Sequence, residues 1–317
     1  MTYEQKIEYA RNYLQRRLEE EFVYPFKVIY EDRHFVFNMK NGKAECRART
    51  RNANEIIHTV VNGSEEEKKE LVNRVFGLLQ AAVRARESTV LSQTSDYEKI
   101  RGELILRPLC YRNVREDLRT VPHIRMGEIA LALYAVMAHV GNDYFTAKVH
   151  RNQIASWKRS ESAILEEALI NTSFLYPPRL YTMDDLVNWD TKSSEDGVFM
   201  GDHPKVRLHG DVRGMVLTNT LELNGAIAMF YPGVAERIAG GFDNDFYIGF
   251  TSVHEAQIHP VGAVPPEVIR ESLMDTNRVC NKKEDVLSGR VYLYDRARRS
   301  FSMLVEGERR EVYWNVR

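Results

Sequence analysis

Residues 129–140 read Ile-Ala-Leu-Ala-Leu-Tyr-Ala-Val-Met-Ala-His-Val, the longest nearly unbroken apolar run of the chain. This run is shorter than the ~20 residues that a helix needs to cross a bilayer. Strand-like patterns lie on either side of it, at 103–109 and, after a Gly141-Asn142 turn, at 143–149. We therefore predict a long buried strand at 129–139 within a soluble globular protein of mixed α and β structure.

Upstream of this run, the pattern predicts a helix, a three-stranded meander and a second helix. Apolar residues recur at helical spacing over 3–21, and Pro25 ends that segment. Strands are expected at 26–31, 34–40 and 43–50. The last two are joined by Asn41-Gly42, which favours a two-residue hairpin turn. A second helix, opened by a capping box of Ser64 and Glu67, is expected to reach about residue 88 and to cover the meander.

The two-residue turn also predicts the register of the hairpin, because it places Lys40 opposite Lys43. One face is then buried, and its pairs are Phe35 with Ala48, Phe37 with Cys46, and Met39 with Ala44. The other face is expected to be wet, and it carries His34, Val36 and Asn38 against Arg49, Arg47 and Glu45. Lys43, Arg47, Arg49 and Arg51 form a basic ridge on the third strand. This ridge could contact phosphates, but Glu45 interrupts it, which favours an ordinary solvated face.

The remaining chain alternates helices and strands. A helix is expected at 160–171, broken by Pro177-Pro178, and a loop or connector at 190–211. Beyond it we expect strands at 215–218 and 245–250, an ambiguous apolar segment at 226–231, helices from Pro232 and over 265–277, and a closing hairpin of 291–294 with 301–304. The pattern predicts an α+β fold of two packed lobes: an N-terminal antiparallel meander with helices and a C-terminal mixed α/β lobe. The expected segments are 1–95, 96–189, the connector 190–211, and 212–317.

Composition narrows the class of protein. The 317 residues include 44 basic and 45 acidic side chains, so the net charge of -1 gives no global field for nucleic acid or a membrane surface. Nucleic acid is therefore an unlikely partner. The three cysteines, Cys46, Cys110 and Cys280, are widely separated, which is typical of a reducing compartment. The charged N-terminal turns do not resemble a signal peptide, and we expect a cytoplasmic location.

The enzyme signatures of nucleotide binding, of the nucleophile elbow and of the zinc proteases are missing from the sequence. The best catalytic candidates are His254 and Glu255, which follow the predicted strand 245–250, where ligands collect in open sheets. Ser252 and Glu255 also match a capping box, so the pair is either a helix cap or a functional pair. His254, Glu255 and His259 do not share one face of a helix or strand, so we expect no metal. No cofactor is indicated.

Five further residues are candidate ligand-binding residues. His123 and Arg125 lie at the edge of the apolar strand region, where Arg125 could anchor an anion. Asn219, Asn224 and Tyr231 surround the ambiguous apolar segment. Each of the five also has a structural alternative, because buried histidines and asparagines often satisfy loop main chain.

An ordered set of motifs resembles a known family. The segments are Val121-Pro122-His123, Leu217-Thr218-Asn219, Asn224-Gly225-Ala226, Tyr231-Pro232-Gly233-Val234 and Ser252-Val253-His254-Glu255. In this order they resemble a bacterial family of unknown function found in anaerobic gut bacteria. The likeness covers about residues 97–310, and the first 90 residues match loosely. It implies no established activity, substrate or cofactor. The chain has Gly249-Phe250 and Thr251 where the resemblance leads us to expect a Pro-Ser-like approach to the histidine motif.

Three functional hypotheses follow. The first is a non-enzymatic cytoplasmic binding or regulatory protein with a cleft near Asn219, Tyr231 and His254. The second is a metal-independent hydrolase or transferase in which His254 is the general base, Glu255 or Asp245 orients it, and Ser252 is the nearest hydroxyl. The third is a weak nucleic-acid binder that uses the basic ridge. For the first two, we expect 215–218 and 245–250 to be parallel neighbours that bring His254 near Asn219 or Tyr231.

Overall fold

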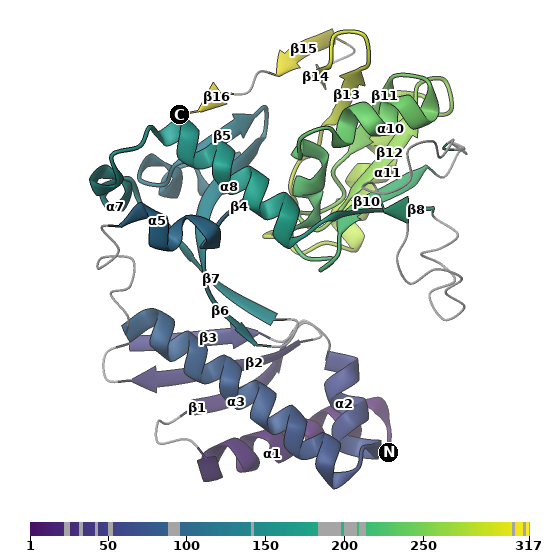
Figure 1. The fold of residues 1–317 in the computed structure, drawn as a ribbon. Helices are drawn as coiled ribbons and strands as arrows, with labels where there is room; N and C mark the ends of the chain where they lie inside the picture. The colour runs from purple at the N-terminus through teal and green to yellow at the C-terminus, as the bar shows by residue number, and fades with distance from the viewer. Residues whose placement is uncertain are drawn as a thin grey trace. The chain divides into compact units, whose positions relative to one another are not determined.

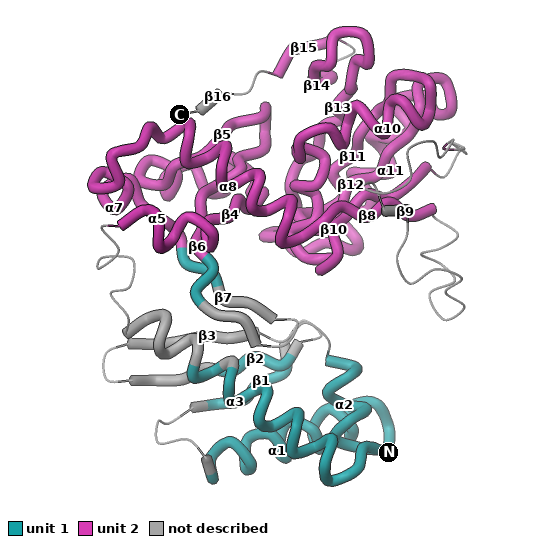
Figure 2. The backbone as a smooth tube through the Cα atoms, in the orientation of Figure 1, with its two compact units in different colours: residues 1–94, 136–147 teal, residues 95–135, 148–317 magenta. Residues whose placement is uncertain are grey.

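The computed structural model describes residues 1–21, 26–31, 34–41, 44–49, 53–87, 96–140, 143–182, 198–199, 208, 214–305, 308–312 and 315–316 (Figure 1). These residues form an α+β fold, as predicted. The chain divides into two compact units (Figure 2), of which unit 1 is residues 1–94 with 136–147 and unit 2 is residues 95–135 with 148–317. Most of the expected connector 190–211 lies outside the described residues, and the four predicted segments stay a prediction. Within the described part of the chain, no helix has the length and apolar composition that crossing a bilayer requires.

Unit 1 begins with three helices and a three-stranded antiparallel sheet. Its elements are α1 (Tyr3–Glu21), β1 (Phe26–Glu31), β2 (His34–Asn41), β3 (Ala44–Arg49), α2 (Ala53–Asn62) and α3 (Glu65–Glu87). The sequence predicted all of these except α2. The predicted capping box is present at the start of α3, because the Ser64 N–H donates to Glu67 Oε2 (2.7 Å) and the Glu67 N–H donates to Ser64 Oγ (3.2 Å).

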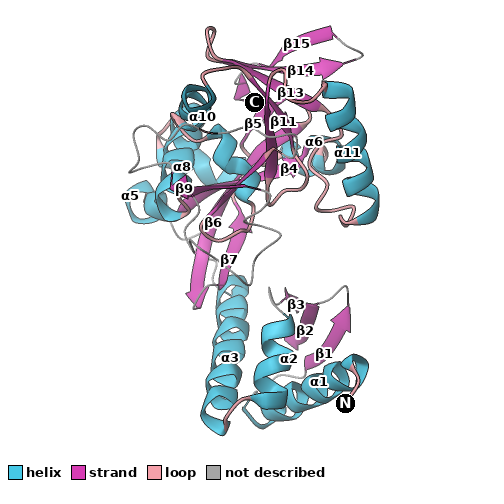
Figure 3. Ribbon diagram, turned by 90° about the vertical axis from the view of Figure 1, so that its right-hand side faces the viewer, coloured by secondary structure: helices cyan, strands magenta, loops and turns pink. Residues whose placement is uncertain are grey.

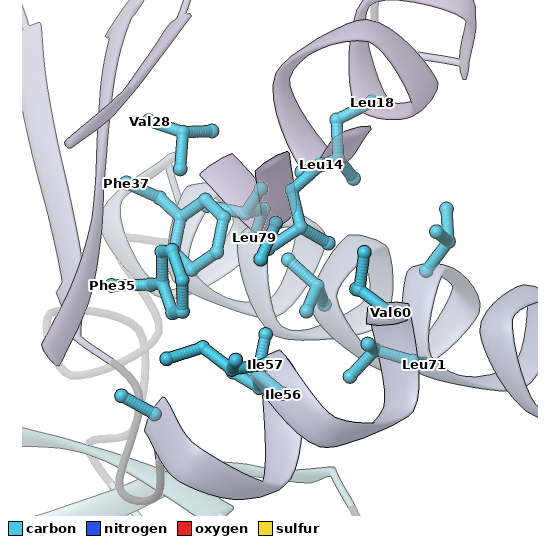
Figure 4. Packing of buried hydrophobic residues seen from close by; sticks show 14 residues of the cluster. Leu14, Leu18, Val28, Phe35, Phe37, Ile56, Ile57, Val60, Leu71 and Leu79 are labelled. Atoms are coloured by element: carbon cyan, nitrogen blue, oxygen red, sulfur yellow. The ribbon is translucent and has the colours of Figure 1, made fainter. Parts of the chain in front are cut away.

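The core of unit 1 lies between its sheet and its helices. Phe35 and Phe37 of β2 are at most 1% exposed, which confirms their predicted burial. Figure 4 shows them among apolar side chains of the helices, which include Leu14, Leu18, Ile56, Ile57, Val60, Leu71 and Leu79. Truncation of a large side chain in such a core typically costs about 3–5 kcal/mol, so this cluster is the main source of stability within the unit.

The register predicted for the hairpin is wrong by two residues. Lys40 pairs with Glu45 and Asn41 with Ala44, so Lys40 does not face Lys43. A shift of two residues preserves the alternation of faces, which is why Phe37 still shares its face with a small residue, now Ala48. The prediction that the other face of the hairpin is exposed to solvent is wrong at Val36, which is fully buried. Apolar side chains of β2 are therefore buried on both faces of the strand. The side chains of the basic ridge lie outside the described residues.

The first sheet of unit 2 has the order β16-β5-β6-β4, with β7 also paired to β6. Its strands are β4 (Leu104–Cys110), β5 (His123–Met126), β6 (Ile129–Val140), β7 (Asp143–Lys148) and β16 (Asn315–Val316). The predicted long strand at 129–139 is β6, and its residues 129–136 are almost completely buried. Because of its length, β6 begins in unit 2 and ends in unit 1. The short helices α5 (Tyr97–Ile100), α6 (Tyr111–Val114) and α7 (Arg151–Ile154) and the longer α8 (Glu161–Leu175) complete this part.

The second sheet of unit 2 has the order β15-β14-β13-β11-β12-β10-β8-β9, and all of its described pairings are antiparallel. Its strands are β8 (Pro178–Thr182), β9 (Val198–Phe199), β10 (Met215–Asn219), β11 (Phe246–Gly249), β12 (Ala256–Pro260), β13 (Val291–Asp295), β14 (Ser300–Val305) and β15 (Glu308–Val312). Helices α10 (Val234–Phe242) and α11 (Pro266–Val279) lie on opposite faces (Figure 3). The Phe246 ring lies 6.3 Å from the Phe242 ring of α10 in a tilted arrangement, whereas Gly249, three residues along β11, faces Ile269 of α11.

Tyr292 of β13 joins the two sheets of unit 2. Its hydroxyl accepts the Glu128 N–H (3.1 Å) and donates to the Met126 carbonyl (3.3 Å) in the turn between β5 and β6. The turn contains Gly127 at φ +62°, where a Cβ would lie 2.9 Å from the Tyr292 hydroxyl. The Glu128 carboxylate also accepts from Ser288 Oγ (2.9 Å). The turn is thus bonded to the second sheet through both its main chain and its side chain.

Tyr292 and its neighbour Tyr294 provide a matched test of this link. Both side chains are 1% exposed, but the hydroxyl of Tyr294 has no hydrogen-bond partner among the described residues. We expect Tyr292→Phe to lower the free energy of unfolding by about 1–3 kcal/mol, because it leaves the Glu128 N–H unpaired. Tyr294→Phe should change it by less than about 0.5 kcal/mol, or increase it, because it removes an unsatisfied buried hydroxyl. Urea denaturation measures both, and equal effects of the two substitutions would contradict this role of Tyr292.

Candidate functional site

The loops around His254 meet at one edge of the larger sheet. Strand β12 lies between β10 and β11 and is antiparallel to both, so the prediction that β10 and β11 are direct neighbours is wrong. These two strands still run in the same direction, and the residues that follow them therefore meet at one edge. Residues 250–255 connect β11 to β12, and no helix begins at Ser252. The helix-cap interpretation is therefore wrong, and Ser252 Oγ instead accepts the His254 N–H (3.0 Å).

His254 is fixed by the main-chain N–H of Asn224 and by the side-chain hydroxyl of Thr218 on β10. Its Nδ1 accepts the Asn224 N–H (3.1 Å), and its carbonyl accepts the Thr218 hydroxyl (2.8 Å). Because a main-chain N–H can only donate, the neutral imidazole carries its proton on Nε2. That nitrogen lies 3.7 Å from Asp285 Oδ1. The ring therefore holds the start of the 225–230 segment against the β11–β12 loop.

The predicted apolar segment 226–231 is a 3-10 helix, η5 (Gly225–Phe230), which is buried throughout. It begins with Asn224 in the left-handed region at φ +54°. A Cβ at Gly225 would lie 2.5 Å from the His254 carbonyl oxygen and 2.8 Å from the Asn219 nitrogen, and it would overlap the Thr218 hydroxyl. Only glycine allows this close approach, which explains why glycine stands at the start of η5.

The structure brings Asn219, Asn224 and His254 together. The Asn219 side chain closes its own loop by donating to the Leu223 carbonyl (3.0 Å) and accepting the Leu221 N–H (3.0 Å). Asn224 Oδ1 accepts from Arg107 Nη2 (3.4 Å) on β4. These polar groups therefore stabilise the loops at the sheet edge.

The other candidates bond elsewhere. The Tyr231 hydroxyl donates to the Thr172 carbonyl on α8 (3.4 Å). Glu255 Oε1 accepts from the Thr251 hydroxyl (3.0 Å) and not from His254. Arg125 Nε donates to the Gly127 carbonyl (3.1 Å), and its guanidinium lies 4.0 Å from the centre of the Tyr111 ring. In the described part of the chain, no cluster of three or more His, Cys, Asp or Glu side chains could hold a metal ion.

His123 is a buried histidine on β5, with only 5% of its surface exposed. Its Nδ1–H donates to the Val121 carbonyl (2.9 Å), and its Nε2 has no partner among the described residues. Burial lowers the pKa of His123 below its ordinary value, and the nearby Arg151 lowers it further. The imidazole is therefore neutral in the folded protein at pH 7.

This arrangement leaves His254 poorly placed for general-base catalysis. Its Nδ1 lone pair already accepts a main-chain N–H, and its Nε2 proton faces a carboxylate. Ser252, the hydroxyl considered as a nucleophile, accepts a hydrogen bond from the His254 main chain. Asn224, Thr218, Ser252 and His254 form a loop clamp, a set of hydrogen bonds that holds neighbouring loops together. These bonds account for the polar residues at this position without a catalytic role.

A groove that the sequence did not reveal lies beside α11, with a volume of about 650 Å³. Its lining residues come from α11 and from one face of the larger sheet: Pro266, Glu267, Arg270, Glu271, Met274 and Asp275 of the helix, and Tyr247, Val291, Leu304 and Arg309 of the strands. Tyr247, Val291 and Leu304 form its apolar floor, and Arg309 pairs directly with Leu304 across β14 and β15. Residues 266–267, 270–271 and 274–275 recur at helical spacing and so form one stripe along α11. This spacing could have indicated a shared surface, but the sequence alone does not show which strands face the stripe.

The groove carries charges of both signs. The side chains of Glu267, Arg270, Glu271 and Arg309 are exposed. None of these four side chains has an ion-pair or hydrogen-bond partner among the described residues. Asp275, in contrast, pairs with Arg278 (2.9 Å). An apolar floor with polar groups at its margin is the general pattern of a binding surface.

Comparison with known proteins identifies a family whose function is unknown. A sequence model described as a family of unknown function, DUF5688, matches residues 50–296. The chain belongs to the DUF5688 family. The matched residues of this DUF5688 chain include the whole His254 loop clamp and all the residues of the groove that lie on α11. No curated protein and no solved structure matches the chain.

Two substitutions of His254 distinguish a clamp from a catalytic base. His254→Ala leaves the buried Asn224 N–H unpaired, and we expect it to lower the free energy of unfolding by about 1–3 kcal/mol. His254→Asn places an amide oxygen near the position of Nδ1, so it should cost less than about 1 kcal/mol. Chemical denaturation of both variants measures the difference. A histidine that stabilised nothing would give an alanine variant as stable as the wild type.

The buried His123 predicts a pH dependence of stability. Its pKa in the folded state is below the ordinary 6.5, so on acidification the unfolded chain takes up the proton first. Stability is therefore complete above about pH 6.5 and falls as the pH drops toward the folded pKa, by up to about 1.4 kcal/mol per pH unit. In His123→Asn, whose amide can still donate to Val121, the curve should be flatter over this range. Parallel pH profiles for the two proteins would refute this assignment.

Proposed function

We propose that this chain is a non-enzymatic binding protein of the cytoplasm and that the groove beside α11 holds a partner polypeptide. The observation that carries the proposal is the group of four unpaired charges around an apolar floor. Exposed charges that lack partners cost nothing to keep in water, and they become selective when a complementary surface covers them. The three widely separated cysteines of the chain support the cytoplasmic part of the proposal.

The loop clamp has a supporting role in this proposal. It fixes the β11–β12 loop and η5, and therefore the end of β11, which contributes Tyr247 to the floor of the groove. We therefore place the proposed binding surface at the groove, and the cleft predicted near Asn219, Tyr231 and His254 stays a prediction. A hydrolase at His254 has no comparable support, because the lone pair that it would need is already bonded.

Site-specific photo-cross-linking tests the proposed function. A photoreactive amino acid replaces Met274, which lines the groove and is 50% exposed, in the full chain expressed in cells. The control position is Phe174 on α8, which is 78% exposed and does not line the groove. We expect a polypeptide adduct from position 274, identified by mass spectrometry, that is lost when Arg270→Glu is added. No adduct at 274, or an equal yield of the same adduct at 174, would overturn the proposal.

A further inference from the structure

The groove beside α11 has a charge pattern that points to one kind of partner. On the helix, Glu267 and Glu271 are about one turn apart, and Arg270 lines the same groove. Arg309 closes the groove from β15, next to Leu304. All four side chains are unpaired among the described residues, and their charges sum to zero. The surface therefore offers two acidic and two basic groups at the same place.

We propose that the partner is a second copy of this chain, with α11 of each copy lying in the groove of the other about a two-fold axis. This inference rests on the proposed binding function and names the partner of the same site. A two-fold axis places a surface patch against itself, so a patch of one sign would repel its copy. A patch with unpaired groups of both signs can instead match acidic groups of one copy with arginines of the other.

The apolar part of the groove fits the same arrangement. Met274 is half-exposed on the stripe of α11 that lines the groove, and Tyr247 and Leu304 of the floor are only partly buried. An unbranched methionine adapts to an irregular apolar surface. Across the two-fold axis, Met274 of each copy would cover the exposed part of the other copy's floor. The net charge of -1 gives no long-range repulsion between copies.

Partners of a single charge sign fit this surface less well. A nucleic acid would pair with Arg270 and Arg309, and a basic peptide with Glu267 and Glu271. In either case the other two charges would be covered without a partner, which costs binding free energy. Only a surface of mixed sign satisfies all four, and a second copy of the chain carries the same two acidic and two basic groups.

Charge reversal in two complementary variants tests the dimer. The first variant is Glu267→Arg with Glu271→Arg, and the second is Arg270→Glu with Arg309→Glu. All four side chains are exposed, so we expect both variants to fold, which circular dichroism and thermal unfolding verify. The matched controls are Glu116→Arg and Arg119→Glu, which reverse charges of an exposed ion pair elsewhere in unit 2. Analytical ultracentrifugation of the full chains measures self-association.

We expect a wild-type dimer, control variants that dimerise like the wild type, and at least about 100-fold weaker self-association of each reversed variant. An equimolar mixture of the two reversed variants should form a heterodimer, because each now supplies the charges that the other lacks. A monomeric wild type at about 100 µM would overturn the inference. So would reversed variants that still dimerise, or a mixture that does not. If the wild type is monomeric, an adduct of position 274 with a different polypeptide would still support the proposed binding function.

Discussion

The junction between the two sheets of unit 2 depends on the hydroxyl of Tyr292. It bonds both the N–H of Glu128 and the carbonyl of Met126, and these residues flank Gly127 in the turn between β5 and β6. Through this one group, an internal strand of the eight-stranded sheet holds the turn of the five-stranded sheet. A buried hydroxyl that both donates and accepts a hydrogen bond fixes the relative position of the two sheets more specifically than apolar packing does. The Glu128 carboxylate, bonded to Ser288, strengthens the same junction.

The polar residues at the edge of the larger sheet work by the same principle. Asn224, His254 and Thr218 lie on three segments that are distant in sequence, and each donates or accepts a main-chain hydrogen bond at the junction. Buried loop main chain must find partners, and side chains supply them where no strand or helix does. A cluster of His and Asn at the ends of strands therefore need not be catalytic. In the proposed binding function, its role is to fix the loop that follows β11, the strand that contributes Tyr247 to the groove.

The groove differs from the clamp in one physical respect. The clamp residues are buried or partly buried and are hydrogen-bonded, whereas the groove side chains of Glu267, Arg270, Glu271 and Arg309 are exposed and unpaired among the described residues. Bonded polar groups rigidify a fold, and unpaired ones remain available for a partner. The groups that are free to bind a partner therefore lie on α11 and β15 and not around His254. It also connects the two features, because Tyr247 on the floor belongs to the strand that the clamp positions.

The sequence by itself determined the local elements. Helical spacing gave α1, α3, α8 and α11, the apolar run gave β6, and the capping box of Ser64 and Glu67 formed as predicted, because these depend on neighbours within a few residues. Among the elements it missed are α2, β5, β8, β12 and β15. The predicted hairpin register was wrong by two residues, because both registers keep the same side chains on the same face. Sequence also brought His254 to the correct edge of the sheet. Only the tertiary structure decided that β12 separates β10 from β11 and that the Asn224 N–H donates to Nδ1 of His254. It alone also decided that α11 and β15 line one groove. These contacts join residues far apart in the chain, so local sequence patterns do not determine them.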